Sequence, residues 1–163
     1  MTPPRGKESR KGNEREWPTT RREEDYLEAI FTIQSEKCVA RAVDVARLLD
    51  VKSPCVTEMF SKLDRKGLLV YRKYEGVTLT TEGMRIGMAV KDRHDSLLIF
   101  LKNLDVQEPI ASKDACTLEH DLSPETIMQI KRFNEFVDMS GDDIPIWLAS
   151  FKQLSRQGKL HQV

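Results

Sequence analysis

The amino-acid sequence predicts a mainly α-helical fold with one short β-hairpin, and two observations lead to this class. From residue 21 onward, apolar residues recur every three or four positions over most of the chain, which is the period of amphipathic helices. Residues 68–80, LLVYRKYEGVTLT, instead show the alternating, β-rich pattern of two strands around a turn. We therefore expect helices, then a hairpin, then further helices.

Composition favours a globular protein of the cytoplasm. Of the 163 residues, 39% are hydrophobic and 32% are charged, and no apolar run approaches the ~18–20 residues of a membrane span. The three cysteines are scattered, which argues against a disulfide framework and for a reducing compartment. Residues 1–20 are polar and Pro- and Gly-containing, with no hydrophobic signal segment, and we expect a flexible tail there.

The first three helices are expected at 21–36, 43–50 and 53–66. In the third, Ser53 is the expected N-cap, Pro54 the first helical position and Gly67 the residue that ends the helix.

Strands are expected at 68–72 and 77–80, joined by a turn at 74–76. Three helices followed by a two-stranded hairpin is the order of a winged helix-turn-helix. In that fold the third helix enters the major groove of DNA and the hairpin, or wing, reaches the flanking backbone. The pattern alone leaves an unrelated small α+β domain as the alternative. Residues 21–80 are the expected DNA-binding domain.

The remaining chain predicts only helices, at 81–103, 111–120, 124–138 and about 144–154. Ser123 is the expected cap of the third of these. Residues 81–163 are thus expected to form a second, helical domain.

Charge is balanced overall but uneven along the chain. Residues 1–22 carry a net charge of +4 and residues 41–75 of +3, whereas residues 105–163 carry −4. A basic front half suits contact with phosphates, although ordinary variation of a charged surface remains the alternative.

The stretch ACTLEH, residues 115–120, gathers a thiol, a carboxylate and an imidazole in Cys116, Glu119 and His120. If it is helical, all three side chains project from one face. These residues alone fit either a partly buried surface helix or half of a metal site.

Three separated blocks resemble the diphtheria toxin repressor family of metal-dependent bacterial transcription regulators, in its short manganese-regulator branch. They are EDYLEAIFTI (24–33), VTEMFSKLDRKGLLVYRKYEGVTLTTEG (56–83) and DACTLEHDLS (114–123). The resemblance covers roughly residues 23–138. It implies a dimeric winged-helix protein that binds operator DNA when loaded with Mn(II) or Fe(II). Because the chain ends soon after these blocks, we expect it to lack the SH3-like domain of the longer branch.

The resemblance also implies a ligand set. The residues matched to metal ligands of the family are Asp25, Glu28, His94, Cys116, Glu119 and His120. Cys116 stands where the manganese branch has Glu and the iron branch has Cys. Leu98 and Ser112 stand where the iron branch has two ligands of its ancillary site, so we expect that site to be absent.

The expected function is a metal-activated DNA-binding transcription regulator, expected to be a repressor, and not an enzyme. Six protein ligands would leave little room for an activated water, and no HExxH, phosphate-binding Gly loop or Ser-His-Asp pattern occurs. The alternative is a winged-helix DNA-binding or protein-interaction module whose metal site is only structural.

The expected partners are double-stranded operator DNA and a second copy of the chain, with no membrane and no small-molecule substrate. Apolar faces around 86–101 and 144–154 would form the homodimer. For Arg41, a plain surface role is about as probable as DNA contact. The residues expected to meet bases or phosphates are Arg41, Lys52, Ser53, Cys55, Thr57, Lys62, Arg72 and Lys73.

Overall fold

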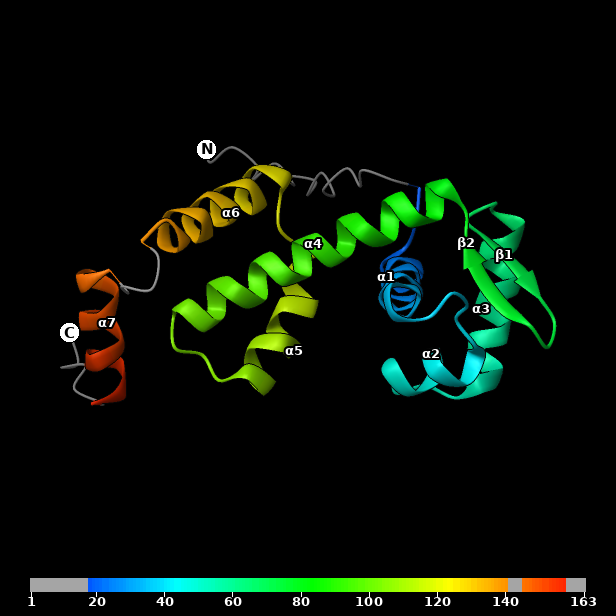
Figure 1. The fold of residues 1–163 in the computed structure, drawn as a ribbon, viewed down its shortest axis with the longest axis horizontal. Helices are drawn as coiled ribbons and strands as arrows, with labels where there is room; N and C mark the ends of the chain where they lie inside the picture. The colour runs from blue at the N-terminus through cyan, green and yellow to red at the C-terminus, as the bar shows by residue number, and fades with distance from the viewer. Residues whose placement is uncertain (1–17, 141–144, 158–163) are drawn as a thin grey trace, which may run out of the picture.

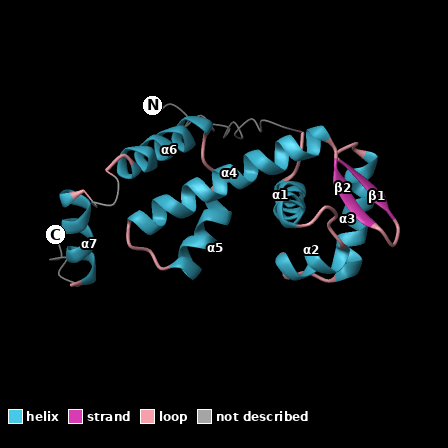
Figure 2. Ribbon diagram, viewed as in Figure 1, coloured by secondary structure: helices cyan, strands magenta, loops and turns pink. Residues whose placement is uncertain are grey.

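The computed structural model describes residues 18–140 and 145–157. These contain seven helices and one two-stranded antiparallel sheet that follows the third helix (Figures 1 and 2), which confirms the predicted fold class. No described helix has both the length and the hydrophobicity needed to cross a bilayer. The elements are α1 (Arg21–Glu36), α2 (Ala42–Leu48), α3 (Ser53–Arg65), β1 (Leu69–Arg72), β2 (Gly76–Leu79), α4 (Thr81–Asn103), α5 (Glu108–Leu118), α6 (Pro124–Asp138) and α7 (Ile146–Arg156).

α1 begins with a capping box. The hydroxyl of Thr20 accepts a hydrogen bond from the Glu23 amide, and the Glu23 carboxylate accepts one from the Thr20 amide. Thr19 is buried and donates to Glu24. Thr19 and Thr20, which were expected in the tail of residues 1–20, belong to this cap. Residues 1–17 lie outside the described residues.

α3 begins at Ser53, as expected, but its N-cap lies one residue earlier than the sequence suggests. Its N-cap is Lys52, whose carbonyl accepts from the amides of Cys55 and Val56, so the expectation of Ser53 as the cap is wrong. Ser53 and Pro54 occupy the first turn. Gly67 ends the helix as expected, with a φ of +71° that favours glycine.

The hairpin pairs Leu69 with Leu79 at its base and Arg72 with Gly76 at its tip. Ala40, before α2, adds a single bridge to Val77 through two backbone hydrogen bonds. The wing is therefore attached to the α1–α2 loop as well as to α3.

α4 is shared by two apolar cores (Figure 1). Its first half, with Ile86 and Val90, packs with α1–α3 and the hairpin, whereas Leu97 in its second half packs with α5 and α6. α1 crosses α4 at Gly87, where an added Cβ would lie 2.6 Å from the Leu27 carbonyl oxygen. Only glycine permits this approach, which brings the acidic face of α1 to the middle of α4.

α5 spans Glu108–Leu118 and not 111–120 as expected. Pro109 fits the first turn of a helix, because its missing N–H needs no partner there. At the other end, the Leu118 carbonyl accepts from the amides of Asp121 and Leu122, which tightens the chain into a turn. Glu119 and His120 therefore lie on this turn and not on the helix.

α7 starts at Ile146, after the N-cap Pro145, two residues later than expected, and Ile144 lies outside the described residues. Leu148 is its buried residue, whereas Trp147, Phe151 and Leu154 are about half exposed. Arg156 pairs with Asp105 at 2.7 Å, which ties α7 to the end of α4.

Replacing Gly87 by alanine should destabilise the protein by about 2–4 kcal/mol, because the new methyl group meets backbone atoms of α1 that cannot move alone. Urea unfolding of the metal-free protein measures this change. Thr81→Ala, at an exposed position in the first turn of the same helix, should change the stability by no more than about 0.5 kcal/mol. A Gly87→Ala protein as stable as the parent would contradict the close crossing.

Candidate metal centre

The first two turns of α1 supply carboxylates on the side that faces α4 and the α5–α6 turn. Asp25 and Glu28 are one helical turn apart, so they project from the same side of α1. His94 lies on α4, seven residues after Gly87, and therefore two turns beyond the crossing. The crossing brings side chains about 65 residues apart in sequence into one cluster.

Glu119 and His120, on the turn after α5, complete this cluster. Glu119 is 1% exposed, and its carboxylate lies 2.9 Å from His94 Nδ1. His120 Nε2 lies 2.8 Å from the Asp25 carboxylate, and its Nδ1 lies 3.1 Å from Glu24. Five of the six residues matched to metal ligands, all except Cys116, thus lie together in one cluster of side chains.

The cluster contains two overlapping groups that could each hold a metal ion. One is Asp25, Glu119 and His120, the other is Glu28, His94 and Glu119, and in each the candidate ligand atoms lie within 4.8 Å of one another. Ligand atoms on opposite sides of an ion with bonds of about 2.0–2.2 Å are about 4.0–4.4 Å apart. Glu119 Oε1 is buried and lies 3.3 Å from His120 Nε2. The donor set therefore fits a divalent cation, with Glu119 common to both groups.

The pKa values in the cluster show a shortage of positive charge around Glu28. Burial and the neighbouring Glu119 carboxylate raise the pKa of Glu28 to about 7. Burial also acts to raise the pKa of Glu119, but hydrogen bonds from His120 and His94 lower it on balance. Burial acts to lower the pKa of His120, but Asp25, Glu119 and Glu24 raise it to about 11. Protonated imidazole thus supplies the compensating charge when no ion is bound.

Cys116 lies beside the cluster but in neither group. It lines a hollow of about 580 Å³ together with Asp25, Glu28 and His94, and its side chain is exposed. Desolvation and the carboxylates of Glu119, Asp25 and Glu28 raise the pKa of its thiol. The thiol is therefore protonated at neutral pH unless a cation is bound nearby.

Two buried carboxylates were missed from the sequence. Glu24 accepts from Thr19 and His120 and lies 3.7 Å from Arg93 of α4, so it orients one proposed ligand through its second ring nitrogen. Glu23 is fully buried and pairs with Lys62 and Lys66. Burial acts to raise its pKa, but hydrogen bonds from Lys66, Thr20 and Lys62 lower it to about 2.

A local signal for Glu23 exists in the sequence. It precedes Tyr26, Leu27 and Ile30 by three, four and seven residues, so it falls on the buried stripe of α1. The charged partners of both carboxylates lie 39–96 residues away, which local periodicity does not reveal.

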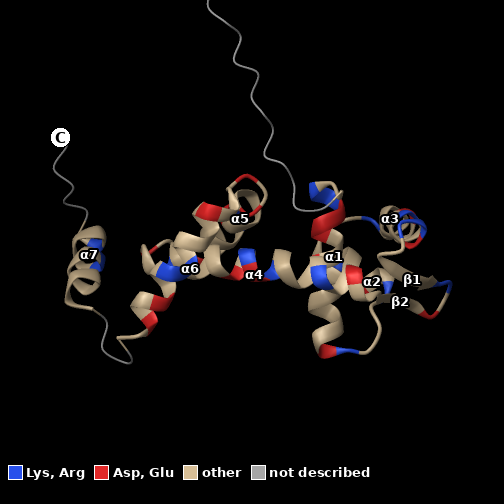
Figure 3. Cartoon of the chain, turned by 90° about the horizontal axis from the view of Figure 1, so that it is seen from above, with Lys and Arg blue, Asp and Glu red and all other residues tan. Residues whose placement is uncertain are grey.

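The residues expected to contact DNA lie on the α2–α3 region and the wing (Figure 3). Ser53 is exposed at the start of α3, whereas Cys55 and Thr57 are partly buried. At the wing tip, Arg72 pairs with the exposed Glu75 at 3.4 Å, and the Lys73 ammonium lies over the Tyr74 ring. Arg41 and Lys52 are exposed caps of α2 and α3. Lys62 differs from the rest because its acidic partner, Glu23, is fully buried.

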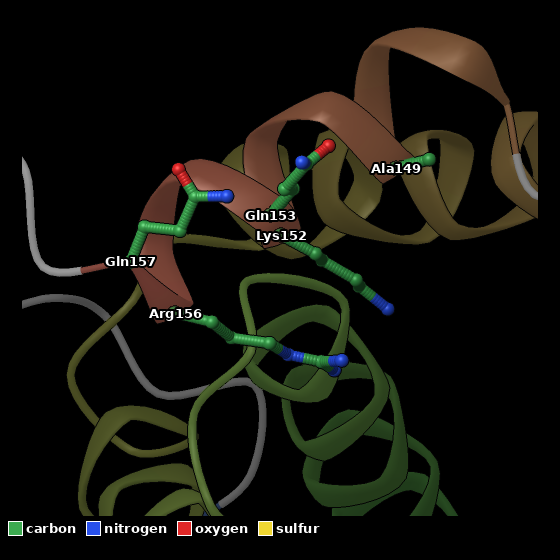
Figure 4. Close-up of a pocket in the computed structure, with 5 residues that line it drawn as sticks. All are labelled: Ala149, Lys152, Gln153, Arg156 and Gln157. Carbon is green, nitrogen blue, oxygen red and sulfur yellow. The ribbon is translucent and has the colours of Figure 1, made fainter.

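A second hollow, on α7, has no comparable chemistry (Figure 4). Its described lining comes from one helix and offers two cations and two amides but no carboxylate, thiol or imidazole. The residues are Ala149, Lys152, Gln153, Arg156 and Gln157.

The sequence matches two family descriptions over most of its length. Residues 18–77 match the iron dependent repressor, N-terminal DNA binding domain, and residues 80–148 match the iron dependent repressor, metal binding and dimerisation domain. An uncharacterized HTH-type transcriptional regulator of Methanocaldococcus jannaschii is 40% identical over 69% of this chain and 91% of that protein. The HTH-type transcriptional regulator MntR of Bacillus pumilus is 36% identical over 85% of this chain and 96% of that protein.

Solved structures of metal-dependent regulators also resemble this chain. A manganese-dependent transcriptional repressor in complex with manganese is 31% identical, with a TM-score of 0.63 over 76% of this chain and 58% of that one. IdeR of T. acidophilum is 25% identical, with a TM-score of 0.62 over 72% of this chain and 55% of that one. The chain therefore spans little more than half the length of these two structures.

Glu28→Gln should stabilise the metal-free protein at pH 8 by roughly 1 kcal/mol or more. The folded-state pKa of about 7 lies above the ordinary 4.5, so the Glu28 carboxyl destabilises the fold increasingly between these pH values and fully above 7. The gain should almost disappear at pH 4.5, where Glu28 is protonated in the folded state and about half protonated in the unfolded state. Urea unfolding at the two pH values measures it.

The matched control is Glu36→Gln, at an exposed position near the other end of α1, which should change stability little at either pH. Equal gains from Glu28→Gln at pH 4.5 and pH 8 would show that Glu28 has an ordinary pKa.

Proposed function

The chain belongs to the iron-dependent repressor family, the diphtheria toxin repressor family of metal-dependent transcription regulators, in its manganese-regulator branch, and we propose that it represses metal-homeostasis genes when metal is bound. Members of this family are DNA-binding regulators and not enzymes. The matched regions supply a DNA-binding domain and a metal-binding and dimerisation domain. We propose a division of the two near residue 80, within the short link between β2 and α4.

One observation supports metal control of DNA binding most strongly. The carboxylates of Asp25 and Glu28 belong to α1, which packs in the same core as α3, whereas Glu119 and His120 follow α5. A cation shared by these residues would join the DNA-reading part to the helical part. Without one, the carboxylates repel, as the raised pKa of Glu28 indicates. Metal loading then favours one arrangement of the two parts, with a coupling of about 1–3 kcal/mol.

The proposed ligands are Asp25, Glu28, His94, Glu119 and His120, with Cys116 as an additional donor from the side of the hollow. Carboxylates and imidazoles suit Mn(II) and Fe(II), and the softer thiolate shifts the preference toward Fe(II) or a later metal. The two overlapping groups accommodate two ions that share Glu119 more readily than one ion with six protein ligands. The rival, a purely structural site, would hold its metal irreversibly and would not alter DNA binding.

We propose that α3 enters the major groove with Ser53, Cys55 and Thr57 toward the bases, while Arg41, Lys52, Arg72 and Lys73 meet phosphates. Two copies would place their α3 helices about 34 Å apart, one turn of DNA.

The proposed homodimer uses exposed apolar side chains of the helical part. Ile86 and Leu97, from the segment 86–101, are buried within the chain, so this segment contributes less surface than expected. About half-exposed apolar residues on α4 and α7 remain available for it, namely Met84, Met88, Ile99, Trp147, Phe151 and Leu154.

Metal should raise operator affinity of the parent protein by about 5–150-fold, and Glu119→Gln should abolish this increase, because both candidate groups share Glu119. The measurement is a DNA-binding titration with Mn(II), Fe(II), Co(II) or Zn(II), on an operator selected from random-sequence DNA. Glu125→Gln, at an exposed position on α6, is the control and should keep the full increase. An unchanged metal response in Glu119→Gln would refute the proposed centre.

Arg72→Ala combined with Lys73→Ala should weaken binding to all DNA sequences alike, because wing residues would meet phosphates and not bases. The slope of log affinity against log salt should become shallower by about one to two units. The control variant Lys131→Ala, Arg132→Ala removes two cations of α6 and should leave this slope nearly unchanged. An unaltered slope in the wing variant would exclude the wing from the interface.

A further inference from the structure

Glu23 connects the start of α1 to the end of α3. Its side chain is fully buried, and its carboxylate lies 3.1 Å from the Lys62 ammonium and 2.8 Å from that of Lys66. It also accepts a hydrogen bond of 2.8 Å from the Thr20 amide. One buried carboxylate thus binds two lysines that lie four residues, or about one helical turn, apart.

Both lysines remain accessible from outside. The side chain of Lys62 is 46% exposed and that of Lys66 is 37% exposed. Lys62 also lines a hollow of about 220 Å³ between α1 and α3, together with Arg22, Arg65 and the exposed Glu58. The surface where α1 meets α3 is therefore basic, but Lys62 and Lys66, two of the four cations named here, are already bound to Glu23.

DNA phosphates would have to compete with Glu23 for these two ammonium groups. If both lysines turned to phosphates, Glu23 would remain as a buried and unpaired charge, which is strongly unfavourable. The exposed Glu75 does not restrain Arg72 in this way, because water can solvate both side chains when their ion pair breaks, at little cost in free energy. Burial distinguishes Glu23 from the surface acids of the same region.

We propose that Glu23 is an internal competitor of DNA phosphates for Lys62 and Lys66, and that it lowers the sequence-independent affinity of the protein for DNA. Non-specific binding comes almost entirely from cation–phosphate contacts, whereas operator binding adds contacts to bases. Withholding two cations therefore weakens non-specific binding more than operator binding. As a result, the protein discriminates better against non-operator DNA, and it leaves DNA more readily when metal is lost. The inference rests on the proposed function, in that α3 faces DNA.

Glu23→Gln tests the proposal, because glutamine keeps an acceptor for the Thr20 amide while removing the charge. Binding of the metal-free full chain to mixed-sequence duplex DNA is measured over a salt series. The variant should bind about 10-fold more tightly near 0.1 M salt, with a slope steeper by about one to two units. Glu36→Gln makes the same charge change at the far end of α1, at an exposed position, and should leave the slope unchanged.

The triple variant Glu23→Gln, Lys62→Gln, Lys66→Gln completes the design. Its slope should return to that of the parent, since the two lysines add nothing while Glu23 holds them. A salt slope of the triple variant that is shallower than that of the parent by about two units would show that the lysines already bind phosphates in the parent. This result would overturn the proposal. This comparison with the parent holds even if Glu23→Gln alone does not fold.

An unchanged slope in folded Glu23→Gln would also overturn the proposal. These outcomes are separate from failure of the proposed function, which would be seen as a parent protein whose operator affinity does not respond to metal.

Discussion

The backbone contact between α1 and α4 at Gly87 is the constraint on which the structure depends. It lets α1 and α4 approach without side chains between them, with an added Cβ excluded at 2.6 Å from the Leu27 carbonyl oxygen. On one side of this crossing, Leu27 and Ile30 fill the core shared with α3 and the wing. On the other side, Asp25 and Glu28 face His94 and the turn after α5. The same contact therefore assembles the DNA-reading core and the candidate metal centre.

The centre itself is a balance of buried charges. Glu119 is almost fully buried and is stabilised by two imidazoles, whereas Glu28 lacks a comparable partner and its pKa is raised to about 7. A divalent cation would satisfy both carboxylates at once, so the arrangement suits a site that exchanges protons for metal. Glu24, which is itself paired with Arg93, and Asp25 bind the two ring nitrogens of His120 and fix the direction of its ring.

Much of this organisation was predictable from the sequence, because the helical period, the hairpin and three family blocks are local patterns. The candidate ligands on α1 and the α5–α6 turn lie in those blocks, and His94 of α4 follows from the same family resemblance. Two local details were not predictable: a carbonyl of Lys52 rather than the Ser53 hydroxyl starts α3, and a tightened turn after Leu118 removes Glu119 and His120 from α5. The pairing of Glu23 with Lys62 and Lys66 depends on how α1 packs against α3, and no local pattern reveals such packing.

α4 is one uninterrupted helix of 23 residues, and this continuity makes it a lever. At 1.5 Å per residue, His94 stands about 20 Å from the wing end of the helix. A rotation of α4 by about 5° around the metal centre would therefore displace that end by about 1.7 Å. Such a displacement is comparable to half the rise of one base pair in DNA, about 3.4 Å. In the proposed function, a rearrangement of a few tenths of an ångström among the ligands would thus be converted into a change of register between protein and groove.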